Sequence, residues 1–229
     1  MASEEEFRLM REQMVEKQLI ARGINNERVL TAMRRVPRHE FLPEEFQHRA
    51  YEDGPLPIGE FQTISQPYIV ALMTQELHLS GHERVLEIGS GSGYQTAVLC
   101  ELAAYVFSLE WYTVLAERAG DILNRLGYHN VDIHSGDGSQ GLADMSPFDA
   151  IIVTAAAPAI PGPLCSQLHP QGGRMVLPVG NKDRQNLQRV VRQGDSCHVE
   201  QIIQVKFVPL VGRYGFKGKS GDSGWEANV

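Results

Sequence analysis

Two carboxylates and three glycines are the residues of this chain whose types and spacing could do chemistry. Glu87 lies in a short apolar run that ends in Gly89, Gly91 and Gly93, and Glu110 ends the next apolar run. Glycine permits positive φ angles and lets a ligand approach the backbone closely. A carboxylate at the end of the next strand can accept hydrogen bonds from the hydroxyls of a ribose. The pattern therefore predicts a nucleotide-binding turn between a strand and a helix.

The spacing of the glycines indicates which cofactor this turn fits. Dinucleotide sites use G-x-G-x-x-G, whereas the chain has G-x-G-x-G, which disfavours NAD. Two carboxylates near a cleft suit a cofactor that carries a positive charge and no phosphates. S-adenosylmethionine has both properties. For this stretch alone, a tight strand-to-helix connection without a ligand is the alternative interpretation.

Strands and helices alternate around the turn, which is typical of a parallel sheet covered on both faces. The pattern predicts strands over 84–88, 105–109, 131–134, 148–154, 174–179, 187–192 and 199–208, the last two antiparallel, and helices over 94–102 and 113–126. The predicted fold is α/β, with a doubly wound, mostly parallel, seven-stranded sheet. Ligands collect at the carboxyl ends of such strands, where Asp137, Gly138 and Thr154 lie.

The segment before the first of these strands is predicted to be a helical extension that can cover the cleft. Apolar spacing predicts helices over 4–22 and from Asn25 or Asn26 to Val36. Breaker residues between 41 and 67 predict an irregular, functional loop, and a helix follows over 69–79. Ser65 stands between loop and helix. The pattern favours it as the N-cap, and the same geometry could bind a carboxylate.

Composition excludes several classes of function. A net charge of -7 with scattered basic residues disfavours nucleic-acid binding. No apolar run is long enough for a membrane span, and the acidic N-terminus is unlike a signal peptide, so a cytoplasmic protein is expected. Three widely spaced cysteines indicate reduced thiols. No metal site is expected, because Ser80 and Gly81 interrupt the pair His78 and His82. A monomer is expected, since no exposed apolar stripe stands out.

Four stretches together resemble the protein-L-isoaspartate (D-aspartate) O-methyltransferases, a branch of the class I S-adenosylmethionine-dependent methyltransferases. They are Gln62–Pro67, Val85–Tyr94, Asp149–Pro158 and Phe207–Gly212, and the resemblance runs from about Met14 to Gly215. It implies a Rossmann-like methyltransferase fold. It also implies a core over 81–216 that holds the cofactor and an N-terminal part over 1–80 with the substrate loop. The tail over 217–229 has no counterpart in the family, and its glycine and serine residues predict that it is flexible.

The resemblance assigns roles to individual residues. It implies that the cofactor is held by Glu87, Ile88, Gly89, Gly91, Gly93, Glu110, Asp137, Gly138 and Thr154. The glycine turn would hold the methionine end, Glu110 the ribose, and Asp137 and Gly138 the adenine. Ser65 matches the serine placed at the substrate carboxylate, which reverses the preference for a cap. The isoaspartyl side would be lined by Thr63, Ile64, Val208, Pro209 and Leu210.

The implied reaction is methylation of the free α-carboxylate of L-isoaspartyl residues in damaged proteins and peptides, with S-adenosyl-L-homocysteine as the product. That carboxylate is ionised at neutral pH, so its attack needs no general base. This agrees with the lack of a His/Asp or Cys/His constellation in the sequence. Two alternatives stay open here: a methyltransferase for a small-molecule carboxylate, and an inactive cofactor-binding module for interactions.

Overall fold

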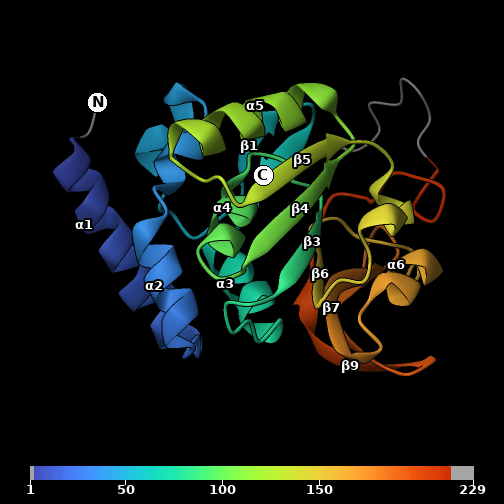
Figure 1. Cartoon of the computed structure of the whole chain (residues 1–229). Coiled ribbons are helices and arrows are strands. Elements are labelled where there is room, and N and C mark those ends of the chain that lie inside the picture. Colours follow the sequence, from blue (N-terminus) through green and yellow to red (C-terminus); the bar gives the residue numbers. More distant parts are fainter. Residues whose placement is uncertain (1–2, 218–229) are drawn as a thin grey trace.

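Seven strands form one sheet in the computed structural model, which describes residues 3–217 (Figure 1). Their order is β5-β4-β3-β6-β7-β8-β9. The strands are β3 (Arg84–Ile88), β4 (Tyr105–Glu110), β5 (Val131–Ser135), β6 (Ala150–Val153), β7 (Gln171–Gly180), β8 (Gln185–Gln193) and β9 (Ser196–Val205). Pairings from β5 through β7 are parallel, and those of β8 are antiparallel. This confirms the predicted fold class.

Side chains on the two faces of the sheet enter two separate hydrophobic clusters. Val85 packs with the N-terminal helices and with α4 (Tyr94–Cys100) and α5 (Thr113–Arg125). Leu86 and Ile88 point the other way, and join the cluster that contains residues of α6 (Gly162–Gln167). Successive strand residues alternate between faces, so a strand covered on both sides is apolar throughout. One exception is Glu87, which is buried within this strand.

The N-terminal extension contributes three helices, of which the first two lie on the side of the molecule away from β9 (Figure 1), whereas Glu76 in the third pairs with Arg189 of β8. Its helices are α1 (Glu4–Met14), α2 (Glu27–Arg35) and α3 (Pro67–Glu76). The first predicted helix continues beyond α1 as a π-helical turn, Val15–Leu19, and a 3₁₀ turn, Ile20–Arg22, and Gly23 ends it with a φ of 90°. Asn26 caps α2 through two backbone N–H groups.

The segment predicted to be an irregular loop contains regular structure, so that prediction was wrong. After the 3₁₀ turn η3 (Arg38–Phe41), the segment forms a second 3₁₀ turn, η4 (Glu44–Arg49), and an antiparallel hairpin of β1 (Leu56–Gly59) and β2 (Gln62–Ile64). Further 3₁₀ turns are η5 (Gly138–Gln140) and η6 (Ala143–Met145). Among the described residues, no helix combines the length and apolarity that crossing a membrane requires.

Candidate active site at the carboxyl ends of β3, β4 and β6

The glycine turn between β3 and α4 lies at the point in the sheet where the strand order reverses: β4 follows on one side of β3 and β6 on the other. β3 pairs with β4 on one side and with β6 on the other, which makes its carboxyl end a topological switch point. Gly89, Gly91 and Gly93 have φ angles of 94°, 52° and 89°. The positive angles explain why glycines occupy these positions, and because glycine has no side chain, a ligand can approach the backbone of the turn closely.

Gly89 is the most tightly enclosed of the three glycines. A Cβ at this position would lie 2.4 Å from Oγ1 of Thr154, which follows β6. The same hydroxyl donates hydrogen bonds to the carbonyl oxygens of Gly89, at 2.6 Å, and Ile88, at 3.0 Å. The N–H of Gly89 donates to the carbonyl of Leu109, at 2.7 Å. Residues of β4 and β6 thus hold the turn in one shape.

Glu110 holds the turn from the end of β4. Its Oε2 accepts a hydrogen bond from the N–H of Gly91, at 2.8 Å, and its Oε1 accepts one from the N–H of Tyr112, at 3.0 Å. Burial raises the pKa of this carboxyl, and the hydrogen bonds from Tyr112 and Gly91 act against that rise. Each carboxylate oxygen retains a further lone pair for a ribose hydroxyl. The geometry supports the ribose-binding role, which stays a prediction.

Glu87 is fully buried beneath the turn, between α4 and β4. Its Oε2 accepts hydrogen bonds from the hydroxyls of Thr96 and Ser108, both at 2.6 Å. Its Oε1 has no partner among the described residues. Burial raises the pKa of Glu87 to about 7, against the hydrogen bonds from Ser108 and Thr96. With no exposed surface, Glu87 is placed to support the turn, and direct contact with a cofactor stays a prediction.

Asp137 and Gly138 follow β5 on the same edge of the sheet. Asp137 accepts hydrogen bonds from Ser139, from the side chain of Gln140 and from the N–H of Arg213. Burial raises the pKa of Asp137, but the hydrogen bonds from Ser139 and Arg213 outweigh it and hold the pKa below its usual range. The carboxylate thus holds the segment around Arg213 against the end of β5. A Cβ on Gly138 would lie 2.4 Å from Cγ2 of Ile88, so this position is close-packed.

The β1–β2 hairpin lies beside the glycine turn. Cδ1 of Ile58 lies 3.4 Å from where a Cβ on Gly91 would be, and the carbonyl of Ile58 accepts a hydrogen bond from Arg118 of α5, at 2.9 Å. Thr63 and Ile64, both predicted substrate residues, belong to β2 and pair with β1. The hairpin therefore brings the predicted substrate segment toward the predicted cofactor turn.

Ser65 directly follows β2, and the prediction that it caps the next helix was wrong. The N-cap of α3 is Gln66, because the helix begins at Pro67, and no side chain caps it. The hydroxyl of Ser65 has no hydrogen bond to any residue within 3–217 and is partly exposed. Its role at the substrate carboxylate stays a prediction.

The second predicted substrate segment, near the C-terminal end of the described chain, lies beside the residues that follow β6. The N–H of Ala156 donates to the carbonyl of Val208, at 2.8 Å, and the N–H of Leu210 donates to the carbonyl of Ala156, at 2.7 Å. These bonds place Pro209 beside Ala156, two residues after Thr154. Val208 and Pro209 are partly exposed, whereas Leu210 is buried in the core.

Several supporting residues were missed because nothing in their local sequence marks them. Thr96 and Ser108 satisfy Glu87 only once α4 and β4 are in place, and Arg118 reaches the hairpin across the turn. Gly212 is also part of the site: a Cβ there would lie 2.0 Å from Oδ1 of Asp137.

Comparison with known proteins gives one consistent family. The profile of the family described as "Protein-L-isoaspartate(D-aspartate) O-methyltransferase (PCMT)" matches residues 10–215. A relative named protein-L-isoaspartate O-methyltransferase 1, from Syntrophobacter fumaroxidans, is 53% identical over 212 residues, which are 93% of this chain and 99% of that protein. Another, from Syntrophus aciditrophicus, is 54% identical over 215 residues, with coverages of 93% and 98%.

Solved structures agree with this assignment. A structure named protein-L-isoaspartate O-methyltransferase is 31% identical, with a TM-score of 0.81, and the match covers 90% of this chain and 67% of that one. A structure from Plasmodium falciparum, named a beta-aspartate methyltransferase in complex with S-adenosyl-L-homocysteine, is 26% identical, with a TM-score of 0.77 and coverages of 88% and 98%.

Proposed function

Because this chain belongs to the protein-L-isoaspartate (D-aspartate) O-methyltransferase family, we propose that the turn at Gly89–Gly93 holds S-adenosylmethionine while Ser65 receives the substrate carboxylate. The chain is a repair methyltransferase that methylates the free α-carboxylate of L-isoaspartyl residues. The observation that carries this function is the family match over almost the whole chain. The small-molecule enzyme and the inactive module are not favoured, since relatives matching end to end share the isoaspartate name.

The residues present fit the cofactor. The cradle made by Gly89, Gly91 and Glu110 has the close backbone and the ribose acceptor that an adenosyl group needs, and a Cβ at Gly89 would collide with Thr154. When bound, S-adenosylmethionine supplies a methyl group on a positively charged sulfur. Glu110 would hold the ribose through its remaining lone pairs, and Gly138, where Ile88 leaves no room for a side chain, would lie at the adenine side.

The protein mainly has to align the acceptor oxygen and exclude water. The acceptor carboxylate carries its charge already at neutral pH, so no side chain must remove a proton. Alignment alone can contribute about 7–11 kcal/mol to a reaction barrier. We propose that Ser65 donates its hydroxyl proton to one oxygen of that carboxylate, and that Thr63, Ile64, Val208, Pro209 and Leu210 exclude water around it.

We propose that two parts of the chain bind the two reactants. Residues 1–80 would shape the substrate side, and 81–216 would hold the cofactor. The tail predicted over 217–229 lies, from residue 218 on, outside the described residues. A cytoplasmic monomer acting on isoaspartyl proteins and peptides is the proposed working form.

Replacing Ser65 by alanine tests its role. We expect kcat/KM for an isoaspartyl peptide to fall roughly 10- to 100-fold, because one hydrogen bond to a charged group is worth about 1.5–3 kcal/mol. Affinity for S-adenosyl-L-homocysteine, measured by calorimetry, should stay unchanged. Ser196→Ala, at the exposed first residue of β9, is the matched control. Unchanged turnover in Ser65→Ala would remove Ser65 from the substrate site.

A further inference from the structure

Glu4, His39 and Glu40 form a cluster of metal-ligating side chains outside the cofactor cradle. Oε1 of Glu4 lies 3.4 Å from Nε2 of His39, and Oε1 of Glu40 lies 3.5 Å from it. One ligand atom from each residue lies within 4.8 Å of the others. Glu4 begins α1, whereas His39 and Glu40 belong to η3, so residues distant in sequence converge on one nitrogen.

His39 is the observation that points to a ligand. Its side chain is only 2% exposed, and Nε2 is buried without a hydrogen-bond partner among the described residues. The rest of the ring is fixed. Phe7 stacks on it with ring centroids 3.9 Å apart, and Nδ1 lies 2.9 Å from the hydroxyl of Tyr51. Nε2 is thus a buried nitrogen that faces two carboxylates, and its ring is already held in place. A cation bound between these three groups would give Nε2 a partner.

We propose that Glu4, His39 and Glu40 bind a divalent transition-metal ion of the Zn²⁺ type. A tetrahedral Zn²⁺ about 2.0–2.2 Å from each nitrogen and oxygen donor sets those donors roughly 3.3–3.6 Å apart. The distances from Nε2 to the two carboxylates agree with this separation. Three protein ligands leave the fourth position to water.

Neighbouring residues supply the outer contacts that a metal-bound histidine requires. With Nε2 on the metal, Nδ1–H donates to the Tyr51 hydroxyl, which also accepts a hydrogen bond from Arg11, at 3.3 Å, so both lone pairs of that oxygen are used. Oε2 of Glu40 is held by Arg125, at 2.6 Å, which leaves Oε1 for the metal. Glu4 and Glu40 place two negative charges at the cation, whereas Arg11 and Arg125 contact Tyr51 and the other oxygen of Glu40. The ion would fasten α1 to η3.

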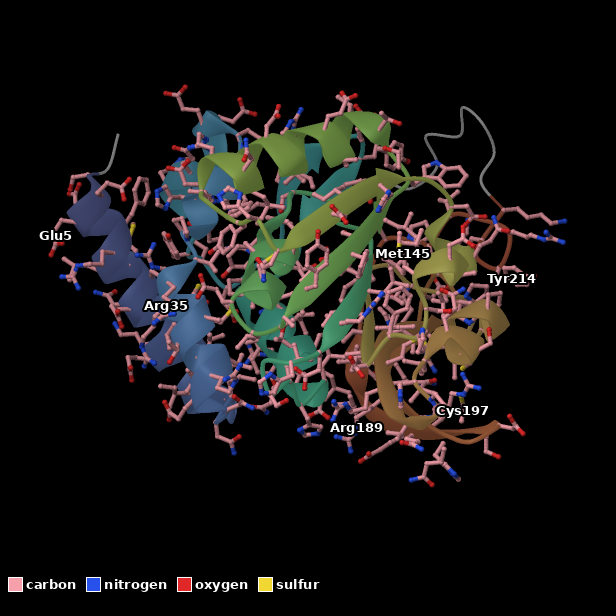
Figure 2. All side chains as sticks on the ribbon, in the orientation of Figure 1. Glu5, Arg35, Met145, Arg189, Cys197 and Tyr214 are labelled. Atoms are coloured by element: carbon pink, nitrogen blue, oxygen red, sulfur yellow. The ribbon has the colours of Figure 1, made fainter. Side chains whose placement is uncertain are left out.

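Calorimetric titration of the chelator-treated full chain with ZnCl₂ tests the site. We expect one equivalent to bind, and Glu4→Gln and Glu40→Gln each to weaken binding at least about tenfold. Glu4 is 83% exposed, so its replacement leaves the fold intact. The matched control is Glu5→Gln, because Glu5 is 65% exposed, pairs with Arg8 and points outward from the same turn (Figure 2). This variant should bind Zn²⁺ like the unmodified chain.

Two readouts make the result decisive. Co²⁺ in place of Zn²⁺ should give the visible absorption of a tetrahedral ion, and Glu4→Gln should change that spectrum. Zn²⁺ should also raise the thermal unfolding midpoint of the unmodified chain and of Glu5→Gln, but not of Glu4→Gln. The proposal is overturned if the chain binds no Zn²⁺, or if Glu4→Gln and Glu40→Gln bind it as well as Glu5→Gln, because the ion would then lie on others of the eight histidines.

Discussion

Alanine at Gly89 is expected to lower the affinity for S-adenosylmethionine at least 100-fold and to destabilise the fold by about 2–4 kcal/mol. The backbone there has a φ of 94°, which costs an L-residue energy, and the new Cβ would lie 2.4 Å from Oγ1 of Thr154. To relieve this contact, Thr154 must give up its hydrogen bonds to the turn. Calorimetry of cofactor binding and urea unfolding measure the two effects.

Two other glycines provide controls for this substitution. Gly120, in α5, has no atom within 4 Å of an added Cβ, so Gly120→Ala should bind the cofactor normally. Gly91→Ala should have a cofactor affinity between the affinities of Gly89→Ala and Gly120→Ala. Its φ of 52° is the left-handed angle that L-residues adopt most easily, and its Cβ would meet only Ile58, at 3.4 Å. Normal cofactor affinity in Gly89→Ala would mean that the turn does not bind the cofactor.

The second large effect concerns stability and pH at Glu87. Burial raises the pKa of this carboxyl from its ordinary value of 4.5 to about 7. Between these pH values the folded state holds a proton that the unfolded state has lost, so the ionised group costs stability as pH rises. We expect the unfolding free energy of Glu87→Gln, minus that of the unmodified chain, to increase by roughly 2–3 kcal/mol from pH 5 to pH 8.

Urea unfolding of both proteins without cofactor, at pH 5 and at pH 8, checks this expectation. Taking the difference between the proteins removes the contribution of other groups, such as Glu83, whose pKa is lowered to about 2 and which therefore acts with the opposite sign. A difference that is the same at both pH values would show that Glu87 titrates as an ordinary glutamate.

The sheet and the turn were predictable because their signals are local. Apolar runs ending in glycines or acids mark β3 and β4, and Gly23 and Asn26 mark the helix ends where the structure has them. The cofactor cradle follows from the same pattern. Strand order then brings Thr154 beside Gly89, as expected at a switch point.

What could not be predicted depends on contacts between distant segments. The β1–β2 hairpin was missed because Glu60 and Phe61 form its turn with positive φ angles, where glycine or asparagine is the usual signal. From the local pattern alone, Ser65 was expected to cap α3, but the helix begins one residue later than that role requires. The carboxylate of Asp137 is occupied by the N–H of Arg213, a partner that no local spacing indicates.

The most direct test is a methylation assay with labelled S-adenosylmethionine and two peptides that differ only in one residue, aspartate in one and isoaspartate in the other. Both peptides carry the same charge and length, so any difference reflects recognition of the α-carboxylate. We predict that label enters the isoaspartyl peptide alone, and that the label is lost in base as expected of a methyl ester. Equal labelling of both peptides, or of neither, would contradict the assigned function.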